Sequence, residues 1–463
     1  WGQPLYGYYQ SKELFVIRKH VEMFIMAGID YLMTDCTNAL FYPEVLYNLM
    51  SVLDEYQKAG WRVPKIACYT NSNSAQTITS IYAAFYEKAN LFPDLWYQPN
   101  GRPVIVGRID PGQLDPQIEN FFDIWKAQWP NEGFFENGFP WMEWVFPQPL
   151  HGKFMSVSVA QHSKGGFCLC DGNWGRGYDH QGHENHESYR LGQNFQSQWD
   201  NAMQQDAQNV FITGWNEWGA QKIYHEGNIV FIDCFNEEYS RDIEPMRGGY
   251  QDAFYLQMIR NIRKFKGQSE EKSQNKQKTI DIHAGSKQWE DIDCVYEALN
   301  LKNPQRDGKT VQEGLTYHTD PAANNIQRVK VTHDINNLYF LIETESDITQ
   351  EHTPNWMNLF ISAGEPKKQG WESYSYVINR RQPGSCDKLN QSGNTITYQT
   401  IEMSVQGNQM QIEIPRDMIG ADENCPCIYF KVADSVEHIK DINDYYITGK
   451  CLPMGRLSYS YNL

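Results

Sequence analysis

The chain lacks any long apolar run, and none of its hydrophobic stretches approaches the ~18 residues of a membrane-spanning helix. Basic residues are in the minority, with 40 Lys and Arg against 57 Asp and Glu, and the formal charge is −17. This charge argues against nucleic acid or an anionic membrane as partner and suits a neutral or cationic ligand better. No secretory leader and no initiator Met are visible. We therefore expect a trimmed, extracytoplasmic protein (periplasmic, cell-surface or secreted).

Several catalytic motifs are absent too. The chain has no G-x-S-x-G, no H-E-x-x-H and no glycine-rich phosphate loop, which weakens the esterase, zinc-protease and kinase hypotheses. Its ten cysteines include two C-x-C pairs but not the C-x-x-C partners of a zinc site. We expect no required cofactor or metal. Small buried thiols are predicted at Cys36, Cys68 and Cys234, and a disulfide is left open for Cys386, Cys425, Cys427 and Cys451.

Residues 1–267 alternate helical and strand patterns. Apolar positions three and four apart predict helices that stop at Gly28 and Gly60, and strands are predicted after them at 29–34 and 65–69. Further strands are predicted at 104–106, 155–160 and 210–213. Repeated βα units indicate a parallel sheet with helices outside, so we predict a (β/α)8 TIM-like barrel. A doubly wound sheet is the alternative, without a phosphate loop to support it.

The second half of the chain follows a different pattern. Residues 268–278 are polar and without apolar period, which predicts a linker. From 279 to 463 the apolar residues recur with a period of two, and hairpin patterns occupy 329–342 and 403–414. Many short strands joined by turns predict an antiparallel β-sandwich.

One pentapeptide, residues 215–219 (Trp-Asn-Glu-Trp-Gly), follows directly on the apolar strand 210–213. Indole rings can stack on the apolar faces of a sugar, and a carboxylate between them can move a proton or stabilise positive charge at a sugar carbon. A strand-end cap is the structural alternative for Glu217. The high content of 14 Trp and 28 Tyr fits a carbohydrate ligand.

Glycoside hydrolysis usually requires two carboxyl groups. Glu143 lies between Trp141 and Trp144, whose apolar surroundings would raise its pKa, so it is the predicted acid beside Glu217. Asp35, at the end of a strand, is predicted to accept a hydrogen bond from a substrate hydroxyl. Other substrate-binding candidates lie at strand ends or in aromatic loops: Tyr8, Tyr9, Asn38, Tyr69, Asn71, His162, Trp174, Arg176, Trp215, Asn216 and Trp218.

A metal site is the weaker interpretation of one acidic stretch. Asp233, Asp242 and Glu244 lie close together in sequence, and three carboxylates near a loop could hold Ca²⁺. Their spacing matches no defined calcium loop, so a salt-bridged start of a helix is the preferred interpretation.

The Asn-Glu-Trp box of residues 216–218 resembles glycoside hydrolase family 99, the endo-α-mannosidase family, and its WbsX-like relatives. Segments 27–31, 211–218 and 240–245 carry this resemblance. It implies a barrel whose first strand is either 5–9 or upstream of residue 1. In the family this Glu acts as a base on the sugar 2-hydroxyl through an anhydro-sugar intermediate, and a second Glu three residues later is the acid. Here Ala220 stands at that position.

Residues 279–463 are similar to carbohydrate-binding modules of family 9, on segments 289–292, 329–340 and 356–360. Candidate sugar-binding aromatics are Trp356, Trp371 and Tyr374, with core packing as the alternative.

The leading hypothesis is a retaining-type glycoside hydrolase acting on α-linked oligo- or polysaccharides of mannoside or glucan type, with Glu217 as base or nucleophile and Glu143 as acid. Because Ala220 replaces the expected acid, the alternative is a non-catalytic glycan-binding protein. A second alternative is a structural or adhesion module that binds a protein partner.

Overall fold

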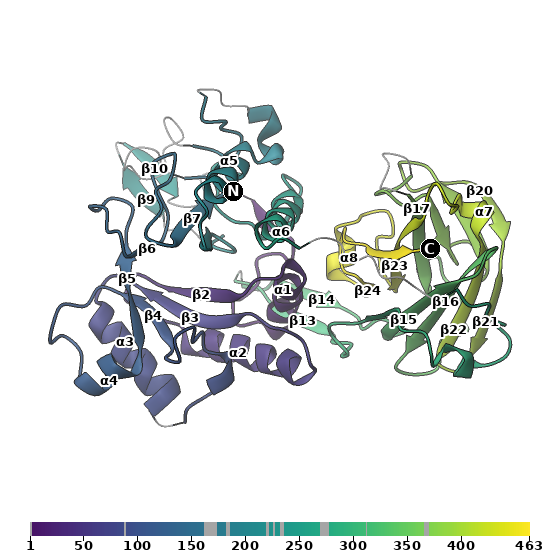
Figure 1. Ribbon diagram of the computed structural model, residues 1–463, viewed down its shortest axis with the longest axis horizontal. Helices are drawn as coiled ribbons and strands as arrows, with labels where there is room; N and C mark the ends of the chain where they lie inside the picture. Colours follow the sequence, from purple (N-terminus) through teal and green to yellow (C-terminus); the bar gives the residue numbers. More distant parts are fainter. Residues whose placement is uncertain are drawn as a thin grey trace. The chain divides into compact units, whose positions relative to one another are not determined.

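The computed structural model describes residues 2–87, 89–161, 174–181, 186–218, 222–225, 227–231, 236–268, 277–311, 313–364 and 370–463. The chain divides into two compact units (Figure 1). The first contains Trp1–Ser269 and the short segment Lys309–Leu315, and the second contains Glu270–Gly308 and Thr316–Leu463. Most of the predicted linker, 269–276, lies outside the described residues.

Parallel strands and helices alternate in the first unit. Five strands form one parallel sheet in the order β2 (Tyr31–Cys36), β3 (Lys65–Thr70), β4 (Val104–Gly107), β5 (Asp123–Gln128) and β6 (Gly138–Pro140). A second parallel sheet pairs β7 (Phe154–Ser158) with β8 (Asn209–Thr213). The predicted βα pattern is therefore present. The described strands do not form a closed barrel of eight, because the two sheets hold seven strands and neither β6 with β7 nor β8 with β2 is paired.

The helices of this unit are α1 (Leu14–Ala27), α2 (Pro43–Lys58), α3 (Ser74–Tyr82), α4 (Pro116–Phe121), α5 (Gln193–Gln204) and α6 (Ala253–Phe265). In α1 the apolar residues Ile17, Val21 and Phe24 are buried, as their spacing predicts. The helix ends where Gly28 adopts a left-handed conformation with φ of 72°. Two antiparallel ribbons complete the unit, one of β1 (Gln3–Pro4) with β11 (Met246–Arg247), the other of β9 (Lys222–His225) with β10 (Asn228–Phe231).

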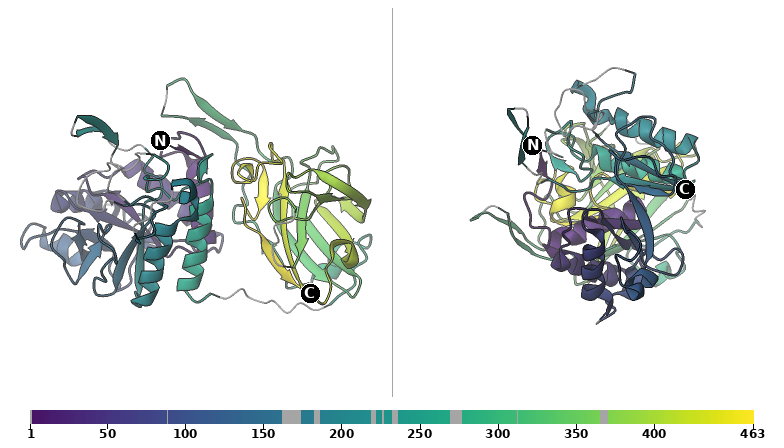
Figure 2. Two further views of the ribbon diagram at one scale, coloured as in Figure 1. Left: turned by 90° about the horizontal axis from the view of Figure 1, so that it is seen from above. Right: turned by 90° about the vertical axis from the view of Figure 1, so that its left-hand side faces the viewer.

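The second unit consists mainly of two antiparallel sheets (Figure 2). One has the order β12 (Val295–Glu297), β15 (Ile326–His333), β16 (Asn337–Thr344), β22 (Gln409–Pro415) and β21 (Glu402–Gln406). The other has the order β20 (Thr395–Thr400), β19 (Ser385–Leu389), β18 (Tyr376–Ile378), β17 (Asn358–Ala363), β23 (Cys427–Asp434) and β24 (Lys450–Leu452), and β25 (Tyr459–Asn462) also pairs with β23.

Short elements occur as well. β13 (Arg306–Lys309) pairs with β14 (Thr316–Thr319), and α7 (Arg416–Ile419) and α8 (Asp444–Ile447) are single turns of helix. The short π and 3-10 helices are η1 (Ala83–Glu87), η2 (Pro93–Leu95), η3 (His186–Leu191) and η4 (Ser286–Trp289).

Both predicted hairpins of the second unit are confirmed. Val331 lies opposite Phe340 in the first hairpin, and Met403 lies opposite Ile412 in the second. Their inward side chains share one hydrophobic core with those of β17 and β23 from the other sheet. The alternation of apolar and polar residues places one face of each strand in this core.

The aromatic residues considered for sugar binding in this unit are core residues. Trp356, Trp371 and Tyr374 are 5%, 3% and 1% exposed. The Trp356 indole donates to the carbonyl of Thr349, and Trp371 packs against Phe360. Core packing is therefore the correct interpretation of all three.

Candidate functional site

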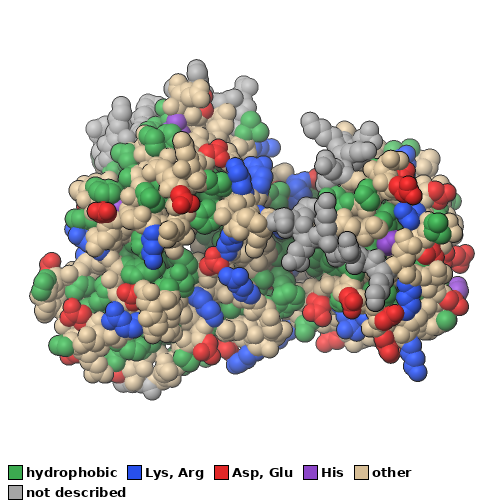
Figure 3. Space-filling model, viewed as in Figure 1, with side chains coloured by type: hydrophobic (Ala, Val, Ile, Leu, Met, Phe, Trp, Pro, Cys, Tyr) green, Lys and Arg blue, Asp and Glu red, His purple; other side chains and the backbone are tan. Residues whose placement is uncertain are grey.

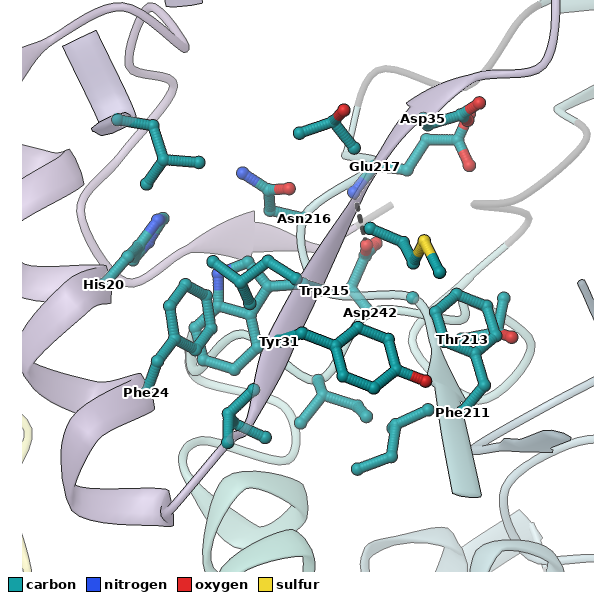
Figure 4. Close-up of a pocket in the computed structure, with 18 of the residues that line it drawn as sticks. His20, Phe24, Tyr31, Asp35, Phe211, Thr213, Trp215, Asn216, Glu217 and Asp242 are labelled. Carbon is teal, nitrogen blue, oxygen red and sulfur yellow. Dashed lines mark hydrogen bonds between the residues drawn. The ribbon is translucent and has the colours of Figure 1, made fainter. Parts of the chain in front are cut away.

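A cavity of about 1140 Å³ lies between β2 and β8 of the first unit. At the start of these strands the Tyr31 hydroxyl donates to Asn209 Oδ1 at 2.7 Å. Apolar side chains that include Leu32 and Phe211 line the cavity, and the polar side chains of Asp35, Asn216 and Glu217 lie at the end where the strands finish (Figure 4). Ligands of parallel α/β sheets bind at this carboxyl end of the strands, so the polar end is the candidate site.

Asp35 reaches this end because of the strand period. Tyr31 and Met33 lie on the same face of β2 and pack, together with Phe211, against a cluster of buried side chains inside the sheet. Asp35 continues that face, and its carboxylate is exposed at the cavity. One carboxylate oxygen accepts the backbone N–H of Thr37 at 2.8 Å, which holds the side chain at the strand end.

Glu217 follows β8 after a turn at Gly214. The glycine has a φ of 96°, and a Cβ there would lie 2.1 Å from the carbonyl oxygen of Arg241, so only glycine allows this close approach. Glu217 is exposed at the cavity, and its backbone N–H donates to Asp242.

Three effects act on the Glu217 carboxyl. The protein atoms around the cavity take part of its water away and raise its pKa, the Arg241 guanidinium lowers it, and the negative charge of Asp35 raises it. The net direction is upward, which favours the protonated form. Figure 4 shows the Glu217 and Asp35 side chains at the same end of the cavity. Two carboxyl groups that share one site can hold one proton between them, and such a pair suits acid–base chemistry.

Asp242 lies directly behind Glu217 and is 1% exposed. Burial raises the pKa of Asp242 to about 7, while the Arg176 guanidinium acts in the opposite direction. Arg176 is itself buried between the rings of Tyr250 and Phe254, and it donates to the carbonyl of Asp242 at 2.6 Å. Arg176, a predicted sugar ligand, therefore holds the 240–244 segment in place.

This buried carboxyl predicts a pH-dependent stability. Between about pH 4, its ordinary range, and pH 7 the folded protein keeps a proton on Asp242 that the unfolded chain has lost. The free energy of unfolding should therefore fall as pH rises through this window, by up to about 1.4 kcal/mol per pH unit from this group. Asp242→Asn should flatten the curve of Tm against pH. Parallel curves for the variant and the wild type would contradict the prediction.

Glu143, the predicted acid, lies in a different environment from the one expected. It is 9% exposed, and its carboxylate hydrogen-bonds His151 Nε2 at 2.7 Å, with both side chains buried. The neighbours Trp141 and Met142 line the cavity, but Glu143 is outside the lining. Of the carboxyl groups that line the same cavity as Glu217, Asp35 lies beside it at the polar end (Figure 4), where its charge acts on Glu217.

Other predicted ligands divide into two groups. Trp215 and Asn216 line the cavity, and so does Tyr9, whereas the adjacent Tyr8 does not. Tyr69 is fully buried and its hydroxyl donates to the carbonyl of Phe139 at 2.8 Å, so it is a core residue, not a residue of the rim. Also outside the cavity lining are Trp218, which is buried, Asn38, Asn71 and Trp174. His162, Ala220 and Asp233 lie outside the described residues.

Among the residues of this site that sequence reasoning missed are His20 and Arg241, which both line the cavity. His20 lies on the apolar stripe of α1, three residues after Ile17, and is 6% exposed. A polar residue on a buried helix face was the available signal. No sequence signal points to Arg241. Its effect on the Glu217 pKa depends on the close approach of its backbone to Gly214, which brings the two segments together.

No group of three metal-binding side chains occurs among the residues that the structure describes. Glu244, considered for calcium, faces three hydrogen-bond donors. Cys386 and Cys425, considered for a disulfide, carry free thiols. In the described part of the chain, no helix combines the length and hydrophobicity needed to cross a membrane. Acidic and basic side chains are interspersed on the face seen in Figure 3.

Comparison with known proteins finds no matching family model and no matching curated protein. Two solved structures of a GH99 endo-alpha-mannosidase from Bacteroides thetaiotaomicron are similar to the chain, one of them in complex with BIS-TRIS-propane. The complex aligns with 57% of this chain and 88% of its own, at 15% sequence identity and a TM-score of 0.34. The other aligns with 58% and 84%, at 16% identity and a TM-score of 0.34.

Proposed function

We propose that the first unit is a glycoside hydrolase that cleaves α-linked glycans at the polar end of the cavity. The observation that carries this proposal is the meeting of Asp35 and Glu217 at one cavity end, with the pKa of Glu217 raised. A pair of carboxyl groups at the scissile bond is the usual requirement for cleaving a glycosidic bond.

The raised pKa favours Glu217 as the acid, a different role from the base suggested by the resemblance. In the proposed reaction Glu217 donates its proton to the glycosidic oxygen as the bond from that oxygen to the sugar carbon breaks. The Asp35 carboxylate stabilises the positive charge that develops on this carbon or attacks it. Water then supplies the hydroxyl group of the product, and its proton restores the acid form of Glu217.

Aromatic side chains at the same end support a sugar ligand. Tyr42 is 62% exposed and lines the cavity, as do Tyr9 and Trp141. Tyr42 follows β2 in the chain and Trp141 follows β6, so both belong to the carboxyl end of the sheet. Rings at these positions can stack on the apolar faces of a sugar, while Asn216 can bond its hydroxyl groups.

The first test is a screen of the purified protein against α-mannosides, α-glucans and host-type glycans, with product analysis by mass spectrometry and binding measured by calorimetry. We expect at least one α-linked glycan to be cleaved, with new reducing ends in proportion to time and protein. Glu87→Gln, an exposed carboxyl outside the cavity, is the matched control and should keep full activity. Binding of a glycan without any turnover would contradict the proposal and identify a glycan-binding protein.

A further inference from the structure

Segment 242–244 lies directly against the loop that carries Glu217. The backbone N–H of Glu244 donates to the carbonyl of Trp215 at 3.0 Å, and that of Glu217 donates to the Asp242 carboxyl. The indole of Trp218 donates to Glu244 Oε2 at 2.6 Å. Trp215 and Trp218, on either side of Glu217, are therefore both bonded to Glu244, and Glu217 itself is bonded to the same segment.

The Glu244 carboxylate is 0% exposed and meets two further side chains from the N-terminal part of the chain. The Tyr9 hydroxyl donates to Oε2 at 2.8 Å, and His20 Nε2 lies 2.7 Å from Oε1. Asn216 Nδ2 in turn donates to the Tyr9 oxygen at 3.1 Å. The Trp218 indole nitrogen can only donate a hydrogen bond. The Tyr9 oxygen accepts from Asn216, and the Tyr9 hydroxyl donates its own proton to Glu244. Glu244 Oε2 is therefore the acceptor of the bonds from Tyr9 and from Trp218.

His20 connects this group to the packed interior. Its ring lies 5.5 Å from the Trp215 ring at 88°, and the Phe24 ring lies 4.7 Å from Trp215 (Figure 4). Both residues belong to α1, a helix held by its apolar stripe. A buried carboxylate is costly unless each oxygen is satisfied, and here both oxygens have partners. A buried carboxylate with both oxygens bonded holds the side chains bonded to it in one arrangement.

We propose that Glu244 is the positioning residue of the site, which holds the 215–218 loop so that the Glu217 carboxyl faces Asp35. This inference rests on the proposed function for its catalytic consequence. Glu244 is not itself part of the cavity lining, although its partners Tyr9, His20 and Trp215 are, and in the proposed reaction it does not touch the substrate. It acts through Trp215, Trp218 and the Tyr9–Asn216 pair.

The test compares Glu244→Ala and Glu244→Gln with the wild type by two readouts: hydrogen exchange of the 215–218 backbone amides, and kcat and KM on the best glycan from the screen. Alanine removes the acceptor for three donors, so the amides should exchange faster and kcat should fall about 100-fold with KM nearly unchanged. Glutamine should recover most of kcat, because its one carbonyl oxygen can accept from Tyr9 and Trp218 while its amide faces His20.

Trp218→Phe serves as a second variant, since it keeps the buried ring and deletes only the indole donor, and it should give a smaller loss of kcat in the same direction. Unchanged exchange and unchanged kcat in the folded fraction of either variant would overturn the positioning role. If the wild type cleaves no glycan but the 215–218 amides exchange faster in Glu244→Ala, the result would contradict the proposed function. It would still support the proposal that Glu244 holds the 215–218 loop.

Discussion

Replacement of Glu217 by Gln is expected to lower kcat/KM for glycan hydrolysis by about 10³-fold, the range that a general acid contributes. The amide keeps the size of the side chain and can still bond its neighbours, but it cannot give a proton to the leaving oxygen. Initial rates of product formation on the natural α-linked substrate measure this effect. Because the pKa of the Glu217 carboxyl is raised, the wild-type activity should persist to a higher pH than an ordinary Glu acid would allow, and decline above that pKa.

A substrate with an activated leaving group separates the acid role from the alternatives. The dinitrophenolate of a dinitrophenyl glycoside leaves as a stable anion and needs no proton. Glu217→Gln should therefore cleave this substrate nearly as well as the wild type does. The Glu87→Gln control should be unaffected on both substrates, since Glu87 lies outside the cavity lining. Equal losses on the activated and the natural substrate would contradict the acid role and favour Glu217 as base or nucleophile.

Replacement of Asp35 by Asn is expected to lower kcat by about 10²-fold or more on natural and activated substrates alike. The Asp35 carboxylate acts on the sugar carbon, and this step remains whatever group leaves. The same substitution removes a negative charge that raises the pKa of Glu217. The alkaline limb of kcat/KM should therefore move to lower pH in the variant, which a pH–rate profile measures.

A control for the second prediction is whether the strand end stays folded in the variant. The amide oxygen introduced by Asp35→Asn can still accept the hydrogen bond from the Thr37 N–H, so we expect it to do so. A similar melting temperature for variant and wild type would show that the strand end is intact. If Asp35→Asn lost activity only on natural substrates, with the alkaline limb unmoved, Asp35 would be a hydroxyl-binding residue, as the sequence suggested.

Local patterns predicted much of the fold. The period of two in 329–342 and 403–414 predicted the hairpins of the second unit, because alternation alone decides which face of a strand is buried. The spacing of Ile17, Val21 and Phe24 likewise predicted α1 and its buried stripe. The closed barrel is not confirmed by the described strands, since pairing between β2 and β8 depends on long-range geometry that no local pattern contains.

The choice of the second carboxylate shows where local reasoning fails. Flanking indoles made Glu143 the predicted acid, but its partner, His151, comes from a loop whose approach the sequence does not reveal. Asp35 has no aromatic neighbours in sequence, and its position at a strand end predicts only a bond to a substrate hydroxyl. In the structure its neighbours at the cavity include Asn216 and Glu217, from a segment far along the chain, so sequence distance was a poor guide to environment.

The sequence by itself determined the alternation of strands and helices, the antiparallel strands of the second unit and the position of Asn216 and Glu217 after the end of an apolar strand. These features depend on the periods of the helix and the strand and on the chemistry of neighbouring residues. Only the tertiary structure decided that Glu217 faces Asp35 and that Glu244 bonds Tyr9, His20 and Trp218. Proton affinity and buried hydrogen bonds depend on distance in space, which folding alone establishes.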